Sequence, residues 1–166
     1  GVARLARAMT SRWDKLDILV LSAAYLPTLT PVTQIDAKQL GQAVTINVLS
    51  TQAILASFDP LLKRSGHGRV IGLTSSVGSQ PRPFWAAYGA TKAAFESLLE
   101  SYAREVEKIG GVRVALVDPG ATRTAMRAKA YPGEDPATVK DPSLVADRLV
   151  ALLVEGFDKL HRERIG

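Results

Sequence analysis

The sequence has 166 residues, a formal net charge of +5 and 46% hydrophobic residues, which is enough for one domain with a single core and excludes a disordered chain. Its basic residues are scattered rather than interleaved with aromatics, so the charge favours a solvated surface over a nucleic-acid site. The absence of cysteine excludes disulfides, thiolate catalysis and thiolate-held metals, and it is compatible with the reducing cytoplasm where we expect the protein.

Helix-like and strand-like segments alternate in the first half of the chain. Residues 2–13 carry apolar side chains at helical spacing, and residues 16–21 form a short, nearly continuous apolar run. Such a run predicts a strand that is buried on both faces. Asp36 can cap a long helix that reaches about Leu62, in which Pro60 predicts a kink or an early end.

The second half continues the alternation. Residues 69–74 predict a second strand, residues 85–108 a helix and residues 112–117 a third strand. Asp118-Pro119-Gly120 ends that strand sharply, and a last helix runs from Pro142 to about Glu155. We therefore predict a single domain, residues 1–166, of the α/β class with a doubly wound parallel sheet, in which ligands bind beyond the carboxyl ends of the strands.

Tyr88 and Lys92 are the strongest candidates for chemistry. They lie four residues apart on a predicted helix and share a face. An ammonium beside a phenol favours the phenolate, so we expect Lys92 to lower the pKa of Tyr88 toward values useful for acid–base catalysis. Ser75, at the end of a predicted strand, can hold a carbonyl oxygen in the same pocket. Taken alone, these residues equally describe a packed tyrosine, a solvated lysine and a turn serine, a role that Ser76 would fill as well.

Four segments in register resemble the short-chain dehydrogenase/reductase family. Residues 74–76 together with 88–94 resemble its active-site segment, and residues 19–24 resemble its fourth strand with an Asn-Ala-Gly signature. Residues 46–48 resemble the segment with its helix asparagine, and residues 117–124 resemble its Pro-Gly-x-x-x-Thr motif. The resemblance covers almost the whole chain. Together with residues 122–136 it points to a bacterial subgroup, often of unassigned substrate.

The resemblance implies an oxidoreductase that uses NAD or NADP and acts on a small alcohol or carbonyl compound. Tyr88 would exchange a proton with the substrate oxygen, Lys92 would bind the nicotinamide ribose, and Ser75 would orient the substrate. Asn47 would hold a water that links Lys92 to solvent, through a local break in its helix. The cofactor would be contacted by Ser22, Ala23, Ala24, Tyr88, Lys92, Pro119, Gly120, Thr122 and Thr124.

The sequence also departs from the family pattern. Ser22-Ala23-Ala24 stands where the family has Asn-Ala-Gly, and no glycine-rich phosphate loop is present. We expect an incomplete Rossmann-like domain that lacks the N-terminal glycine-rich βαβ portion and the last strand, with residues 16–21 as an apolar edge. We accordingly expect these residues to belong to a longer polypeptide and not to bind NAD(P) tightly by themselves.

Two other functions remain open on the sequence. The chain could be a non-catalytic fragment or remnant of such an enzyme, and a nucleic-acid-binding module would rest on net charge alone. Phe84, Trp85 and Met126 could line an apolar pocket. Arg82, Arg123 and Arg127 could meet an acidic substrate. Small residues on the helices at 44–62 and 85–106 favour a homodimer or homotetramer. We expect no metal, no nucleic acid and no membrane as a partner.

Overall fold

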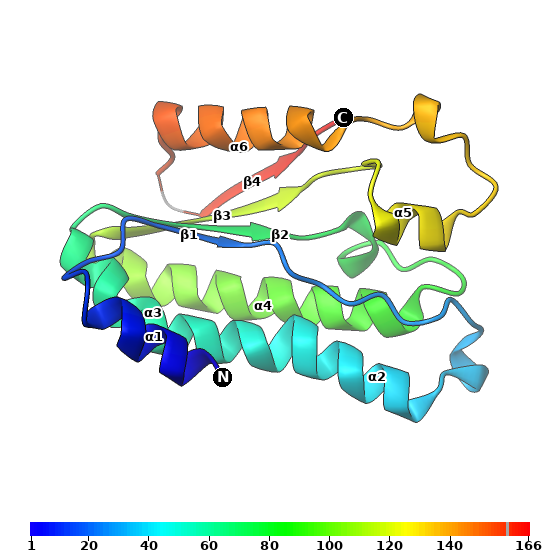
Figure 1. Ribbon diagram of the computed structural model, residues 1–166, viewed down its shortest axis with the longest axis horizontal. Helices are drawn as coiled ribbons and strands as arrows, with labels where there is room; N and C mark the ends of the chain where they lie inside the picture. The colour runs from blue at the N-terminus through cyan, green and yellow to red at the C-terminus, as the bar shows by residue number, and fades with distance from the viewer. Residues whose placement is uncertain (159) are drawn as a thin grey trace.

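The central strands of the sheet come from the apolar runs of the sequence. The computed structural model describes residues 1–158 and 160–166. Its strands form one parallel sheet in the order β1-β2-β3-β4, with the bounds Ile18–Leu21, Gly68–Leu73, Val112–Asp118 and Leu160–Arg164 (Figure 1). β2 and β3 are almost entirely buried, as is usual inside a parallel sheet. The predicted α/β class with a parallel sheet is confirmed.

Helices cover both faces of this sheet (Figure 1). One face carries α1 (Val2–Thr10), α2 (Ala37–Val44), α3 (Ser50–Ser65) and α4 (Ala86–Ile109), and the other carries α6 (Pro142–Glu155). The short helix α5 (Ala125–Ala130) follows β3, and single 3-10 turns occupy Val32–Gln34, Ser76–Gly78 and Pro136–Thr138. Within the described residues, no helix combines the length and apolar character that crossing a bilayer requires.

The core is divided by the sheet into two layers. Val70 and Val114 pack with the side chains of α3 and α4, whereas Ile71 and Ala115 pack with Leu152 of α6. This division follows from the alternation of side chains along a strand. The continuous apolar runs in the sequence therefore supply both layers.

The long helix predicted from Asp36 is present, but it is interrupted and it runs further than predicted. The Asp36 carboxylate accepts a hydrogen bond from the backbone N–H of Gln39 at 2.8 Å and caps α2. A π-helical turn, η2 (Thr45–Leu49), then joins α2 to α3. The prediction of an early end at Pro60 was wrong, because α3 continues to Ser65. Leu61 and Leu62 are buried directly after the proline, and their packing offsets the one missing hydrogen bond.

β1 lies at the edge of the sheet, as expected for an apolar edge at this position. The prediction that this strand is buried on both faces was wrong, since Ile18 is 47% exposed and Val20 is 42% exposed. Leu19 and Leu21 point to the other side and pack into the core beneath the helices.

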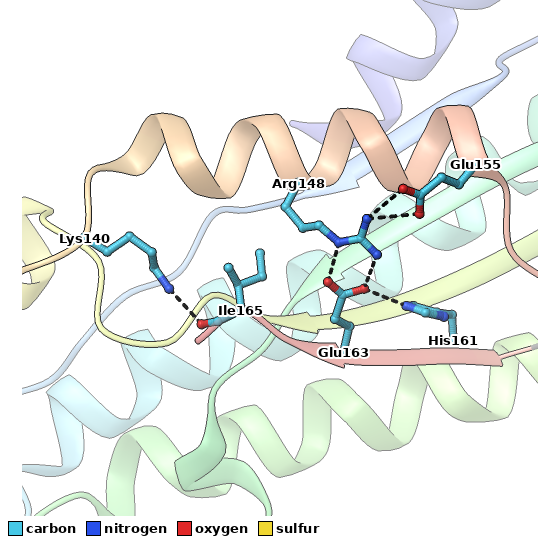
Figure 2. Close-up of polar contacts among 6 residues, drawn as sticks. All are labelled: Lys140, Arg148, Glu155, His161, Glu163 and Ile165. Carbon is cyan, nitrogen blue, oxygen red and sulfur yellow. Dashed lines mark hydrogen bonds and ion pairs between the residues drawn. The ribbon is translucent and has the colours of Figure 1, made fainter.

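The expectation that the last strand is absent was also wrong. β4 pairs with β3 from Val114↔Leu160 to Asp118↔Arg164. The strand was missed because Leu-His-Arg-Glu-Arg has no apolar run. Ion pairs of its charged side chains with other elements supplement the pairing with β3. Arg148 of α6 binds Glu163 with contacts of 2.5 and 2.9 Å, and it also binds Glu155 (Figure 2). His161 lies 3.0 Å from the same Glu163 carboxylate.

Candidate active site

A cavity of about 630 Å³ opens at the carboxyl ends of β1, β2 and β3. It lies where the residues after parallel strands meet, as the sequence predicts. All the residues that we expected to contact a cofactor line it, as does Ser75. These residues are Ser22, Ala23, Ala24, Ser75, Tyr88, Lys92, Pro119, Gly120, Thr122 and Thr124. Asn47, the remaining predicted site residue, lies outside the lining.

Tyr88 and Lys92 occupy the first turns of α4 and share a face, as their spacing predicts. Both side chains are buried, with 6% of Tyr88 and 3% of Lys92 exposed. The ammonium of Lys92 donates a hydrogen bond of 2.8 Å to the carbonyl oxygen of Leu73, the last residue of β2. Its nitrogen lies 5.8 Å from the centroid of the Tyr88 ring and 4.5 Å from that of Phe95. Lys92 therefore links the helix to the end of a strand.

The electrostatics of the pair differ from our expectation. Burial raises the pKa of Tyr88 to about 12, and the negative charge of Asp118 acts in the same direction. Burial lowers the pKa of Lys92 to about 8, against the opposing effects of Glu96 and Asp118. Burial is the largest cause of both shifts, and the ammonium of Lys92 donates its hydrogen bond to a backbone carbonyl. In the protein alone, Tyr88 keeps its proton at neutral pH.

Ser75, rather than Ser76, lines the cavity. The neighbouring Thr74 donates its hydroxyl hydrogen to Glu96 at 2.5 Å, and the Ser76 hydroxyl accepts a hydrogen bond of 3.1 Å from Arg82. The sequence could not separate the two serines, because the choice depends on the extended backbone of Ser75 before the 3-10 turn Ser76–Gly78.

Asn47 lies in the π-helical turn, which is the local break that the resemblance implied. Its carbonyl oxygen Oδ1 accepts a hydrogen bond from the backbone N–H of Tyr25 at 2.7 Å. Its amide nitrogen donates to the Tyr25 carbonyl at 3.0 Å and to the Thr91 hydroxyl at 2.8 Å. Thr91 in turn donates to the carbonyl oxygen of Tyr88 at 2.8 Å. Asn47 thus connects the loop after β1 to the turn of α4 that carries Tyr88.

The turn after β3 forms another wall of the cavity. Gly120 has φ +65°, and its N–H donates to the Asp118 carboxylate at 2.9 Å. A Cβ at this position would meet the Ile165 carbonyl oxygen at 2.6 Å, so only glycine fits. The Thr122 hydroxyl bonds back to the Pro119 carbonyl at 3.1 Å, and Thr124 caps α5.

Asp118 is a site residue that the sequence reasoning used only to end a strand. It lines the cavity, and its charge raises the pKa of Tyr88 and of Lys92. The available signal was its position, since Asp118 is the acidic residue at the start of the Pro-Gly turn. Within the described residues, no group of three His, Cys, Asp or Glu side chains is arranged to hold a metal ion.

Two of the three apolar residues predicted to line a pocket do so in the structure. Trp85 and Met126 line the cavity, whereas Phe84 is 56% exposed and lies outside the lining. Phe84 has φ +72°, a left-handed conformation that turns its side chain away at the entry to α4.

Comparison with known proteins connects this site to a protein family. Residues 1–135 match the sequence model described as short chain dehydrogenase. The uncharacterized oxidoreductase YciK of Escherichia coli K12 is 34% identical over 140 residues, which are 84% of this chain and 55% of YciK. An uncharacterized oxidoreductase of Staphylococcus epidermidis is 30% identical over 122 residues, which are 74% of this chain and 52% of that protein. The chain spans about half the length of these curated relatives.

Solved structures share the fold over nearly the whole chain. A putative short chain dehydrogenase from Pseudomonas syringae has a TM-score of 0.91 and 33% identity, covering 98% of this chain and 67% of its own. A short chain dehydrogenase from Shigella flexneri, complexed with NADP, has a TM-score of 0.89 and 32% identity, covering 98% and 68% of the two chains. One from Escherichia coli CFT073, complexed with NADPH, has the same TM-score, identity and coverage.

Proposed function

This chain belongs to the short-chain dehydrogenase family, and we propose that it carries the catalytic site of an oxidoreductase that transfers a hydride between a nicotinamide cofactor and an alcohol or carbonyl compound. The observation that carries the proposal is the single cavity lined by Ser75, Tyr88 and Lys92. The similar structures complexed with NADP or NADPH favour NADP(H) over NAD(H) as the cofactor.

The residues of the cavity fit the nicotinamide end of such a cofactor. Its volume of about 630 Å³ is in the range of small-molecule sites. Lys92 would hydrogen-bond the nicotinamide ribose, and the turn at Pro119 and Gly120 would lie along the nicotinamide ring. Thr122 would lie beside that turn, and Thr124 would reach the carboxamide or a phosphate. The remaining contacts, on the adenosine side, would come from Ser22, Ala23 and Ala24. When bound, the cofactor supplies or accepts the hydride.

Residues of this chain would donate the proton that the substrate oxygen takes up during reduction. Ser75 would orient the substrate oxygen, and Tyr88 would donate its proton to that oxygen as a carbonyl becomes an alcohol. A pKa of about 12 keeps the proton on Tyr88 until the developing alkoxide, a stronger base, takes it. Lys92, with a pKa of about 8, can release or take up a proton near neutral pH and so help to restore Tyr88. The protonated form of Tyr88 is the form that carbonyl reduction requires.

Asn47 would act through position rather than by touching the substrate. Its hydrogen bonds to Tyr25 and Thr91 fix the loop after β1 against the turn that carries Tyr88. Its backbone carbonyl accepts from the Thr51 hydroxyl at 3.1 Å and has a second lone pair available to a bridging water. That water would connect Lys92 to solvent.

The proposal is tested by NADPH consumption on a panel of aldehydes and ketones. We expect Tyr88→Phe to lower kcat/KM by at least about 100-fold, because it removes the proton donor and little volume. Tyr102→Phe is the matched control on the same helix, since its hydroxyl binds Asp59 at 2.9 Å outside the cavity. Turnover by Tyr88→Phe that equals the control would refute the assignment.

A further inference from the structure

The cavity next to Tyr88 has an apolar wall. The Trp85 ring meets the Tyr88 ring edge-on, with centroids 6.0 Å apart. Met126 and Ala130 of α5 pack into the same cluster together with Leu26, and Trp85, Met126 and Ala130 all line the cavity. A substrate whose oxygen reaches the Tyr88 hydroxyl therefore has its neighbouring group in contact with this wall.

Besides Lys92, Arg127 is the one basic residue that lines the cavity within the described residues, and it forms an ion pair within the chain. Its guanidinium binds the Glu134 carboxylate with two hydrogen bonds, of 2.6 and 2.5 Å. The guanidinium carbon also lies 3.8 Å from the centroid of the Tyr131 ring, which in turn lies 5.9 Å from the Trp85 ring. Arg127 thus braces the segment behind Trp85, and the Glu134 carboxylate already balances its positive charge.

Basic residues near this wall also form hydrogen bonds or ion pairs within the chain. Lys129 donates to the Leu26 carbonyl at 2.6 Å, and Arg123 pairs with Asp141. Lys140 donates to the Ile165 carbonyl at 2.7 Å, as Figure 2 shows, and to that of Gly166 at 2.8 Å. These internal pairings do not favour the hypothesis that arginines of this region receive an acidic substrate.

We propose that the substrate carries an uncharged apolar group, aromatic or branched alkyl, next to its reacting carbon; this rests on the proposed oxidoreductase function. A carboxylate or phosphate in that place would lie unpaired against Trp85 and Met126, at a high desolvation cost. Arg127 offers such an anion no net positive charge, because the Glu134 carboxylate already balances its guanidinium. The site therefore selects against anionic substrates.

Two ketones of the same shape test this with the full protein and NADPH. 4-Methylacetophenone and 4-acetylbenzoate share the ring and the ketone and differ in a methyl against a carboxylate. We expect kcat/KM to favour the methyl compound by at least about 30-fold. Met126→Lys places an unpaired cation on the wall and should reduce that preference by at least about 10-fold. Ile109→Lys, at the exposed far end of α4, should leave the preference unchanged.

A binding measurement separates failure of this inference from failure of the proposed function. Ligand-observed NMR gives the Kd of each ketone whether or not it is reduced. Tighter binding of 4-methylacetophenone that is lost in Trp85→Ala supports the inference, even if neither ketone is turned over. The absence of turnover would overturn the hydride-transfer proposal instead. Equal or preferred binding or turnover of 4-acetylbenzoate overturns the inference, and so does binding of neither ketone.

Discussion

Lys92 is a buried amine with one backbone hydrogen-bond acceptor, the carbonyl of Leu73. Its protonation therefore affects the stability of the folded chain. Its pKa is lowered to about 8 in the folded chain, mainly by burial, against an ordinary value of 10.5. The folded state therefore holds this proton less tightly than the unfolded state. This difference in proton affinity makes the free energy of unfolding depend on pH.

Between about pH 8 and pH 10.5 the unfolded chain binds more protons at this lysine than the folded chain, so the Lys92 contribution to the free energy of unfolding rises with pH. Tyr88, with its pKa raised to about 12, acts in the opposite direction only above its ordinary value of 10.0. We expect Lys92→Met to be relatively more stable than the wild type near neutral pH, and this advantage to shrink toward about pH 10. Urea denaturation of both proteins at several pH values measures the difference. A difference that does not change with pH would contradict the buried, perturbed lysine.

Residue types and spacing predicted which residues meet at the cavity, but not their protonation or their individual partners. The i, i+4 spacing placed Tyr88 and Lys92 on one face. It could not show that Leu73 supplies a carbonyl to the ammonium. Nor could it show that the Asp118 charge adds to the raised pKa of Tyr88 and opposes the lowered pKa of Lys92. These effects depend on residues brought in by the sheet from distant parts of the chain.

Among the elements, the π-helical turn Thr45–Leu49 has the most direct role in the site, because it carries Asn47. Asn47→Leu keeps the side-chain volume and removes three hydrogen bonds. The backbone N–H and carbonyl of Tyr25 and the hydroxyl of Thr91 then lose their partner. We expect a loss of about 2–4 kcal/mol in the free energy of unfolding. Thr45→Ala, in the same turn but exposed, should change it by less than about 0.5 kcal/mol. Urea denaturation compares the two, and equal effects would argue against a bridging role for Asn47.

β4 is the element that depends most on ion pairs. The hydrogen bonds from Arg148 are the main reason that the pKa of Glu163 is lowered from 4.5 to about 2. The stabilisation is present above about pH 4.5 and is lost as the pH falls toward about 2. Glu163→Gln should therefore be less stable than the wild type at neutral pH and lose less stability on acidification. Glu107→Gln, an exposed change on α4, should follow the wild type. Thermal unfolding across this pH range checks both, and a wild-type acid profile in Glu163→Gln would contradict the account.

The elements that the sequence predicted well are those with a strong local signal. Residues 112–117 and 85–108 gave β3 and α4 to within one or two residues, since an apolar run and an apolar periodicity mark them. β4 was missed because its partners, Arg148 and Glu96, come from other elements. The end predicted at Pro60 was overridden by the burial of the leucines that follow it. In both cases tertiary contacts decided the outcome.

On the scale of the whole molecule, small exposed residues on α3 and α4 support the expected homo-oligomer. Ala56, Ala90 and Ala93 are exposed, and small side chains allow helices to approach closely. We expect light scattering at micromolar concentration to give a mass of two or four subunits. Ala93→Arg should shift that mass toward one subunit, whereas Ala8→Arg on α1 should not. A wild-type mass of one subunit would contradict this expectation.

We propose that a nicotinamide and a carbonyl substrate meet at Tyr88 in the cavity beyond β1, β2 and β3. The most direct measurement uses NADPH carrying deuterium at both C4 positions, with mass spectrometry of the alcohol formed from 4-methylacetophenone. The account predicts one deuterium on the carbinol carbon of the wild-type product. It also predicts that Tyr88→Phe forms this product at least about 100-fold more slowly, while Tyr102→Phe forms it at the wild-type rate. An alcohol without deuterium, or equal rates for the two variants, would contradict it.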